Sequence, residues 1–462
     1  MRRLCGVVLL LAGCTVGPDY EPPPMKVPTE WGEKAETATT DLSTWWTIFN
    51  DETLNRLVDL AVRSNHDLRI AAKRVDEARA ELSVVKGYIL PEIDLTGSYS
   101  RSRVSPNAQA VQFAEIYQSR YKVGFDASWE IDVFGHGRRR VEAAAANLES
   151  WIENRRAVLV TLLGDVGRNY IGLRGNQLLL AALRQNVATA RGTVEITQAR
   201  LTAGVATTLD VARAEAQLAS TEAALPDVEA AIKQTIHRLS VLLGYPPETL
   251  TPELLAEAPI PSAPARVIVG LPSELLLRRP DVRQAERRLA EATATVGAAM
   301  ADLYPRFSLT GAFGLDSLSS TDFLKWQSRA WSLGPSIRWP IFAGGRLQAQ
   351  VAVEDARKEQ ALAAFEKAVL IALEDVENAL VDYLREGERR SRLDAAVTAN
   401  RKAVELADDL YRKGLTSFID VLDAQRALYI SQAELARSQS QVTLDLVALY
   451  KALGGGWESK EK

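Results

Sequence analysis

Four segments of the sequence alternate strictly between apolar and polar positions, and they occur as two pairs. In the first segment, Ile93, Leu95 and Tyr99 share one face, whereas Asp94 and Thr96 share the other. The segments span about residues 92–103, 119–131, 306–315 and 329–341. This period of two predicts β-strands about as long as a tilted strand that crosses a bilayer. A sheet packed on a helix would show the same alternation, so the pattern alone leaves both interpretations open.

Long helical segments are predicted after each pair of strands. The sequence has no proline in residues 107–225 or 341–462, and these runs combine alanine with charges of both signs, which is typical of extended helices. Gly204 and Gly414 predict turns, after which apolar positions recur at helical spacing. The resulting antiparallel helical hairpins are expected at about residues 138–245 and 345–452. Glycines that indicate a bend or close packing within the first run are Gly164, Gly167, Gly172 and Gly175.

The two halves of the chain repeat one plan. GVATTLDVARAEAQL begins at Gly204 and GLTSFIDVLDAQRAL begins at Gly414, a spacing of 414 − 204 = 210 residues, with five identities in register. A repeat this long indicates a duplicated half-molecule rather than a solenoid. We predict a first repeat at residues 45–250, a linker at 251–279, a second repeat at 280–453 and a C-terminal tail at 454–462.

Four strands cannot close a barrel, and an unpaired strand edge is not tolerated in lipid. A membrane interpretation therefore requires several chains to share one barrel. Two chains would give about eight strands, whose interior fills with side chains, so at least three copies are expected around an aqueous lumen. The apolar stripes of the helical hairpins are also too long to be buried within one chain, and they predict packing against the same copies.

The N-terminus predicts export and lipidation. Arg2 and Arg3 precede a short apolar run, which ends in the sequence Leu-Ala-Gly-Cys at residues 11–14. This pattern resembles a bacterial lipobox, in which Cys14 becomes the acylated first residue; an ordinary signal peptide with a chance cysteine is the alternative. Thr15, where an inner-membrane lipoprotein would have Asp, favours the outer membrane by the same resemblance. We predict a signal peptide at residues 1–13 and a lipidated tether at 14–44.

Composition excludes several other classes of protein. The net charge is only −4, with both signs interspersed, so no nucleic-acid partner is indicated. His66, His136 and His237 lack the spacing of metal ligands, and no thiol remains after removal of Cys5 and acylation of Cys14. We therefore expect no catalytic site, no metal and no cofactor.

Taken together, the CTVGPDYEPP start, the doubled strand-and-hairpin plan and the YRKGLTSFIDVLDAQR segment at residues 411–426 resemble the outer-membrane efflux protein family. This family comprises the TolC-like channels, and the lipobox is similar to that of its OprM/NodT-type lipoproteins of RND tripartite efflux systems. The resemblance covers nearly the whole chain. It implies an α+β membrane channel: a homotrimer whose 12-stranded β-barrel continues as a 12-helix periplasmic tunnel.

The resemblance also implies a function and partners. The chain would conduct drugs or other small molecules passively from an inner-membrane RND-type pump and a periplasmic adaptor protein to the exterior. It would be anchored in the outer membrane by its N-terminal acyl group. A duct for type I protein secretion is the alternative within the channel class, and a lipid-anchored coiled-coil structural protein is the alternative outside it.

Two acids mark a candidate periplasmic gate. Asp420 and Asp423 are three residues apart, which places both carboxylates on one face of a helix. In a trimer they would form two stacked rings of carboxylates that favour and hold cations. Both acids match family positions that line the entrance constriction. A solvated helix face is the alternative interpretation.

A candidate latch lies beside the turn glycines Gly204 and Gly414. Asp210 and Tyr411 match a family acid and tyrosine that hold the closed tip together, and a carboxylate that accepts a phenol hydrogen bond would supply the contact. The family arginine two residues past the second glycine is replaced by Thr416. Alternatively, Tyr411 only packs its ring between helices and Asp210 is a hydrated acid at a helix start.

Overall fold

The computed structural model describes residues 15–25, 27–33, 36–37, 42–103, 105, 107, 116–262, 268–269, 272–273 and 278–458. The predicted signal peptide and Cys14 lie outside these residues. The chain forms two compact units, each built from three stretches of sequence. The sheet unit comprises residues 1–24, 74–152 and 284–366, and the hairpin unit comprises residues 25–73, 153–283 and 367–462.

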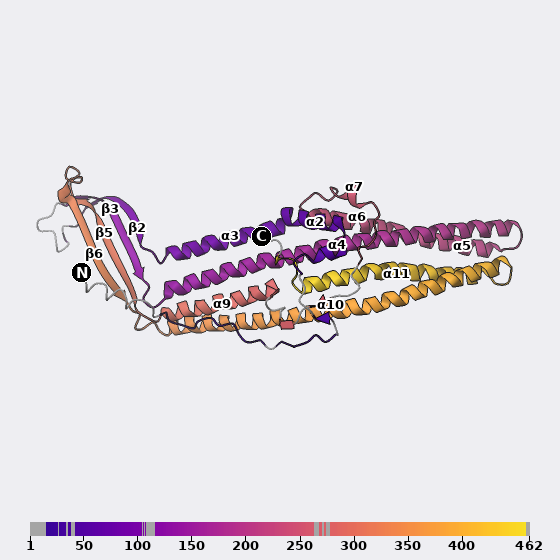
Figure 1. Ribbon diagram of the computed structural model, residues 1–462. Helices are drawn as coiled ribbons and strands as arrows, with labels where there is room; N and C mark the ends of the chain where they lie inside the picture. Colours follow the sequence, from indigo (N-terminus) through magenta and orange to yellow (C-terminus); the bar gives the residue numbers. More distant parts are fainter. Residues whose placement is uncertain are drawn as a thin grey trace. The chain divides into compact units, whose positions relative to one another are not determined.

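An antiparallel four-stranded sheet dominates the sheet unit (Figure 1). Its strands follow the order β2-β3-β5-β6, so the second strand of the first repeat pairs with the first strand of the second. The strands are β2 (Glu92–Arg103), β3 (Tyr117–Ile131), β5 (Arg306–Ser317) and β6 (Arg329–Arg338). The fourth strand is three residues shorter than the predicted range, since Trp339 lies beyond its last paired residue.

The sheet exposes a continuous row of apolar side chains. Leu95 pairs with Phe125, Phe125 with Phe313, and Phe313 with Trp331, so one row crosses all four strands. Leu95 is 69% exposed and Trp331 is 74% exposed. Within the described part of the chain, β2 and β6 each pair along one edge only. The apolar row is therefore not covered by a helix within the described residues.

Helices adjoin the sheet in the same unit. They are α3 (His66–Gly87), which begins in the hairpin unit, α9 (Pro280–Ala301), and the first parts of α4 (His136–Thr202) and α10 (Arg346–Arg412). A tryptophan in each repeat fixes the chain just before a strand. Trp129, in β3, donates from Nε1 to the Ile89 carbonyl at 2.9 Å, and Trp339, just after β6, donates from Nε1 to the Leu303 carbonyl at 3.1 Å. The two tryptophans are 339 − 129 = 210 residues apart.

The start of the predicted tether is docked rather than free. The side chain of Arg139 is 3% exposed and donates to the carbonyls of Val16 and Gly17, both at 3.1 Å, and to Asp19 at 2.8 Å. Gly17 has φ +96° and lies so close to Gly297 that a Cβ would come within 2.4 Å of its Cα. Residues 16–19 therefore pack against α4 and α9 in a defined position.

The hairpin unit contains the remaining helices. They are the 3₁₀ turn η1 (Trp45–Phe49), α2 (Glu52–Ser64), α5 (Thr208–Glu222), α6 (Leu225–Leu242), α7 (Thr251–Leu254) and α11 (Phe418–Ala452), with the later parts of α4 and α10. Two short strands, β1 (Glu36–Thr37) and β4 (Ile268–Val269), pair in parallel. The first hairpin's second arm is divided into α5 and α6, because Pro226 has no N–H to continue the α5 hydrogen bonds.

The packed core of this unit is centred on Trp45. Its ring stacks on Tyr450 with centroids 5.7 Å apart and meets Trp46 and Phe49 edge-on. Two glycines of α4 allow close packing, because a Cβ at Gly167 would lie 3.0 Å from Trp45 and a Cβ at Gly175 would lie 2.5 Å from Ser440, whereas a Cβ at Gly172 would meet nothing within 4 Å. Since α4 is continuous through these glycines, Gly167 and Gly175 serve contact between helices. Within the described residues, every helix is too short or too polar to span a membrane.

Candidate functional site at the helical hairpin tips

The two hairpin tips have the same backbone turn. Gly204 and Gly414 have φ +74° and +73°, and the space around each would admit a side chain, so conformation rather than crowding requires glycine. Val205 N–H donates to the Arg200 carbonyl and Leu415 N–H to the Leu410 carbonyl, both at 2.9 Å. These bonds, with those of the glycine N–H groups, end α4 and α10 in the same left-handed cap.

Both return helices begin with a capping box. Asp210 accepts hydrogen bonds from the N–H and the hydroxyl of Thr207, at 2.9 and 2.8 Å. Asp420 accepts from the N–H and hydroxyl of Ser417, at 3.1 and 2.7 Å, and from the Thr416 hydroxyl. Thr207 is the N-cap of α5, which begins at Thr208. Thr416 thus donates directly to Asp420, one of the two candidate gate acids.

The candidate gate acids differ in their surroundings. Hydrogen bonds from Thr416 and Ser417 lower the pKa of Asp420, so this exposed carboxylate is ionised at neutral pH. Asp423 is 66% exposed, and its nearest ion-pair partner is Arg426 at 3.8 Å. Arg426 in turn donates to Gln217 at 2.6 Å and so connects α11 to α5. Both acids are available to solvent at one end of α11, and their pairing into rings stays a prediction.

Tyr411 is a core residue of the tip. Its ring lies 5.5 Å from that of Phe418, and the Arg200 guanidinium stacks over it at 4.4 Å. The surrounding cluster consists of Val194, Ala214, Phe418, Val421 and Leu422. Within the described residues, the buried Tyr411 hydroxyl has no hydrogen-bond partner. Sequence reasoning missed Arg200, because the contact joins residues that only the folded turn brings together.

The structure does not join Asp210 to Tyr411 within one chain, because Asp210 binds Thr207 and the Tyr411 hydroxyl is unbonded among the described residues. Closing the predicted latch requires Tyr411 to turn outward or Asp210 of another copy to approach. An unmade buried hydrogen bond costs about 1–3 kcal/mol, which is a reason for such a group to gain an acceptor on assembly.

We expect Tyr411→Phe, which deletes only the hydroxyl, to raise single-channel conductance or periplasmic leak severalfold, since it removes a contact of about 1.5–3 kcal/mol per chain. Asp210→Ala should do the same. Tyr429→Phe is the matched control, because Tyr429 is also buried with an unbonded hydroxyl. Unchanged conductance and leak in both Tyr411→Phe and Asp210→Ala would exclude the latch.

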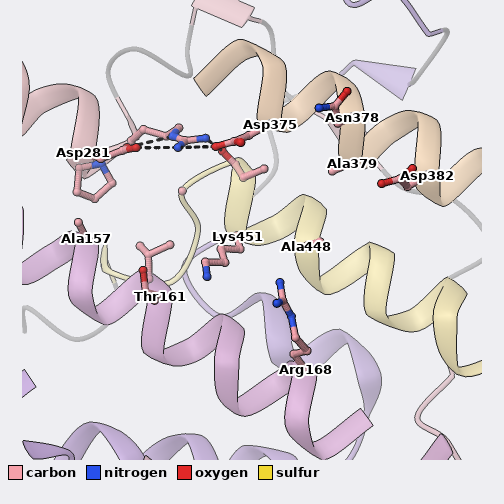
Figure 2. A pocket seen from close by; sticks show the side chains of 15 residues that line it. Ala157, Thr161, Arg168, Asp281, Asp375, Asn378, Ala379, Asp382, Ala448 and Lys451 are labelled. Atoms are coloured by element: carbon pink, nitrogen blue, oxygen red, sulfur yellow. Dashed lines mark hydrogen bonds and ion pairs between the residues drawn. The ribbon is translucent and has the colours of Figure 1, made fainter. Parts of the chain in front are cut away.

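A buried arginine joins three elements of the hairpin unit elsewhere (Figure 2). Arg279 pairs with Asp281 at 2.7 Å and with Asp375 at 3.0 Å, and donates to the Ala452 carbonyl at 3.0 Å. The adjoining cavity of about 370 Å³ is lined by Lys451 and Arg168 as well. Ion pairing keeps the pKa of Arg279 raised despite its burial, and the arrangement fixes the α9 start against α10 and α11.

In the described part of the chain, no group of three or more His, Cys, Asp or Glu side chains is placed to hold a metal ion. His136 contacts Asp302, and His237 contacts Glu248. What the two hairpin tips share is a matching turn followed by a capped helix, with carboxylates near the turn.

The chain thus combines two features. One is a sheet with an exposed apolar face and with outer edges that no described residue pairs with; the other is a duplicated helical hairpin with acidic side chains at its tips. Together they define an α+β protein of the membrane-channel class.

Comparison with known proteins agrees with this class. The Outer membrane efflux protein family matches residues 57–245 and 271–455. Nodulation protein T of Rhizobium leguminosarum bv. trifolii is 34% identical over 98% of this chain and 97% of its own length. The toluene efflux pump outer membrane protein TtgI of Pseudomonas putida is 33% identical over 97% of each. The solved outer-membrane channel OprN superposes with a TM-score of 0.92 at 36% identity, over 96% of this chain and 100% of that one.

The chain belongs to the outer membrane efflux protein family. The predicted family and the α+β fold of four strands and long helical hairpins are confirmed. The chain is an outer-membrane efflux component, as predicted.

Proposed function

We propose that three copies of this chain form a lipid-anchored efflux channel, with a 12-stranded barrel in the outer membrane and a 12-helix tunnel in the periplasm. The observation that supports this proposal is the sheet, whose apolar row is exposed and whose outer strands β2 and β6 each have one edge that no described residue pairs with. Pairing β2 of each copy with β6 of the next satisfies both edges and turns the apolar row toward lipid. Three copies leave a lumen wide enough for solutes, which two copies do not.

The position of the start of the tether, at Thr15 and Val16, supports acylation at Cys14. Thr15 packs so closely on Gly135, where the sheet passes into α4, that a Cβ added at Gly135 would lie 2.8 Å from the Thr15 side chain. In addition, Val16 N–H donates to the Phe134 carbonyl. An acyl group on the preceding residue would therefore start next to the sheet, whose apolar face would lie in lipid. A tether that packs against the sheet unit from its first residues favours a membrane anchor at Cys14 over an ordinary signal peptide with a chance cysteine.

We propose that the partners are a periplasmic adaptor protein and an inner-membrane RND-type pump, with the tips near the adaptor. The channel conducts passively and has no catalytic role and no cofactor. Small molecules are favoured as cargo over proteins, because relatives that match nearly the whole chain are named for toluene and antibiotic efflux. A structural coiled-coil protein would not need the exposed apolar sheet.

The test is the conductance of the purified full-length protein in planar bilayers, with its migration on gels before and after heating. We expect a heat-sensitive trimer and stable single-channel currents. A monomer that yields no current in bilayers would overturn the channel. A trimer whose currents require an unfolded polypeptide cargo would instead favour the type I secretion duct.

A further inference from the structure

A small polar cavity lies in the sheet unit, where β3 passes into α4. It has a volume of about 200 Å³, and the residues that line it include Tyr88, Glu130, Asp132, His136, Arg140 and Arg306. This volume is below the range of about 300–1,000 Å³ that holds a drug-sized molecule, so it suits a small polar group. All lining residues belong to one unit.

The cations of this cavity are not equally available. Arg306 pairs with Asp302 and lies 3.8 Å from Glu130, and His136 Nδ1 lies 2.9 Å from Asp302. Arg140 differs, because its guanidinium stacks over the Tyr88 ring at 5.7 Å and has no carboxylate partner among the described residues. An arginine held by an aromatic face keeps its donors for an oxyanion.

The acids of the cavity balance that cation. Glu130 is 46% exposed, and among the described residues its ion-pair contact is the long one to Arg306, at 3.8 Å. Asp132 is occupied by Arg138, whose backbone N–H donates to it at 2.8 Å. A bare phosphate at Arg140 would have these carboxylates as neighbours, which is unfavourable. A ligand that carries a phosphate and an ammonium group can satisfy Arg140 and Glu130 at once.

The rim of the cavity indicates where such a ligand comes from. Tyr88 is 68% exposed and Leu90 is 66% exposed, and the apolar face of β2 begins immediately afterwards with Ile93. Aromatic and aliphatic side chains beside charged groups are typical of the membrane–water interface. A headgroup in the cavity would therefore direct its acyl chains along the exposed face of the sheet.

We propose that this cavity binds the headgroup of an ethanolamine phospholipid, with the phosphate at Arg140 and the ammonium group at Glu130. The proposal rests on the proposed placement of the sheet in the outer membrane. It adds a lipid site to repeat 1 only. The position that corresponds to Arg140 in repeat 2 is Gln350 (140 + 210 = 350), and the position that corresponds to Glu130 is Pro340 (130 + 210 = 340).

The test is native mass spectrometry of the full-length protein in detergent, titrated with phosphatidylethanolamine, phosphatidylglycerol or phosphatidylcholine. We expect phosphatidylethanolamine to bind best, and Arg140→Gln, which installs the repeat 2 residue, to weaken it about tenfold through loss of a charge-assisted hydrogen bond. Glu130→Gln should weaken phosphatidylethanolamine but not phosphatidylglycerol. Arg103→Gln, at the opposite end of β2, removes the same charge outside the cavity and should change nothing.

Equal binding of the ethanolamine and glycerol lipids, or equal effects of Arg140→Gln and Arg103→Gln, would overturn the site. If free phosphoethanolamine binds as tightly as the lipid, the site belongs to a soluble zwitterion and the lipid assignment is wrong. Single-channel conductance of the same variants separates this proposal from the channel itself. Conductance without lipid preference refutes only the lipid site, whereas absence of conductance in the unmodified protein refutes the channel.

Discussion

The double variant Asp420→Ala, Asp423→Ala should lose most of its cation selectivity and bind blocking divalent cations at least about tenfold more weakly in bilayer recordings. Three copies of each acid would form two rings of carboxylates, and their loss removes the charge that holds a cation at the narrowest point. Hydrogen bonds from Thr416 and Ser417 lower the pKa of Asp420, so its ring remains ionised at neutral pH. Selectivity should therefore persist as the pH falls toward the ordinary carboxylate range.

The matched control for charge is Asp408→Ala, Asp409→Ala. These acids lie on α10 near the same tip, but they already pair with Arg412 at 2.8 Å and with Lys413 at 2.6 Å. Removal of both should leave divalent block within about twofold of the unmodified channel, because paired surface charges contribute little. Equal loss of block in the two double variants would show that general tip charge, and not a carboxylate ring, binds the cation.

Trp45→Ala should produce the largest loss of stability, about 3–5 kcal/mol in the free energy of opening of the C-terminal part of α11. Trp45 is 2% exposed and fills the space between Tyr450, Phe49 and Gly167. Hydrogen exchange of the α11 backbone amides measures this free energy directly.

Trp326→Ala is the control for this substitution, since Trp326 is 67% exposed and its loss should change stability by less than about 0.5 kcal/mol. Exchange in α11 that is equally slow in the Trp45→Ala variant and the unmodified protein would mean that Trp45 does not hold the core of the hairpin unit together.

Much of the fold could be predicted because its strongest signals are local. The strands alternate over ten or more residues, and the turns at Gly204 and Gly414 are specified by glycine and by a hydroxyl residue three positions before an aspartate. The exposed apolar face of the sheet also agrees with the prediction, since its alternation has the period of a strand that meets two environments.

Long-range contacts between polar groups could not be predicted in the same way. Arg139 is 120 residues from Asp19, and Arg279 is 96 residues from Asp375. Nothing in the spacing of such residues indicates which acid an arginine will meet, because the contact depends on the rotation of packed helices. Tyr411 shows the same limit, since its position beside the turn is local but the stacking of Arg200 on its ring is not.

The edges of β2 and β6 that no described residue pairs with have a genetic consequence. If each copy contributes strands to one shared barrel, a subunit that enters the membrane but cannot pair its edge strands inactivates the whole assembly that contains it. Co-expression of equal amounts of normal and defective subunits would leave only about one assembly in eight free of the defective chain, if three subunits mix at random. Alleles with a proline in β2, which has none, should therefore act dominantly in a cell that also carries the normal gene, whereas alleles that prevent synthesis of the chain should be recessive.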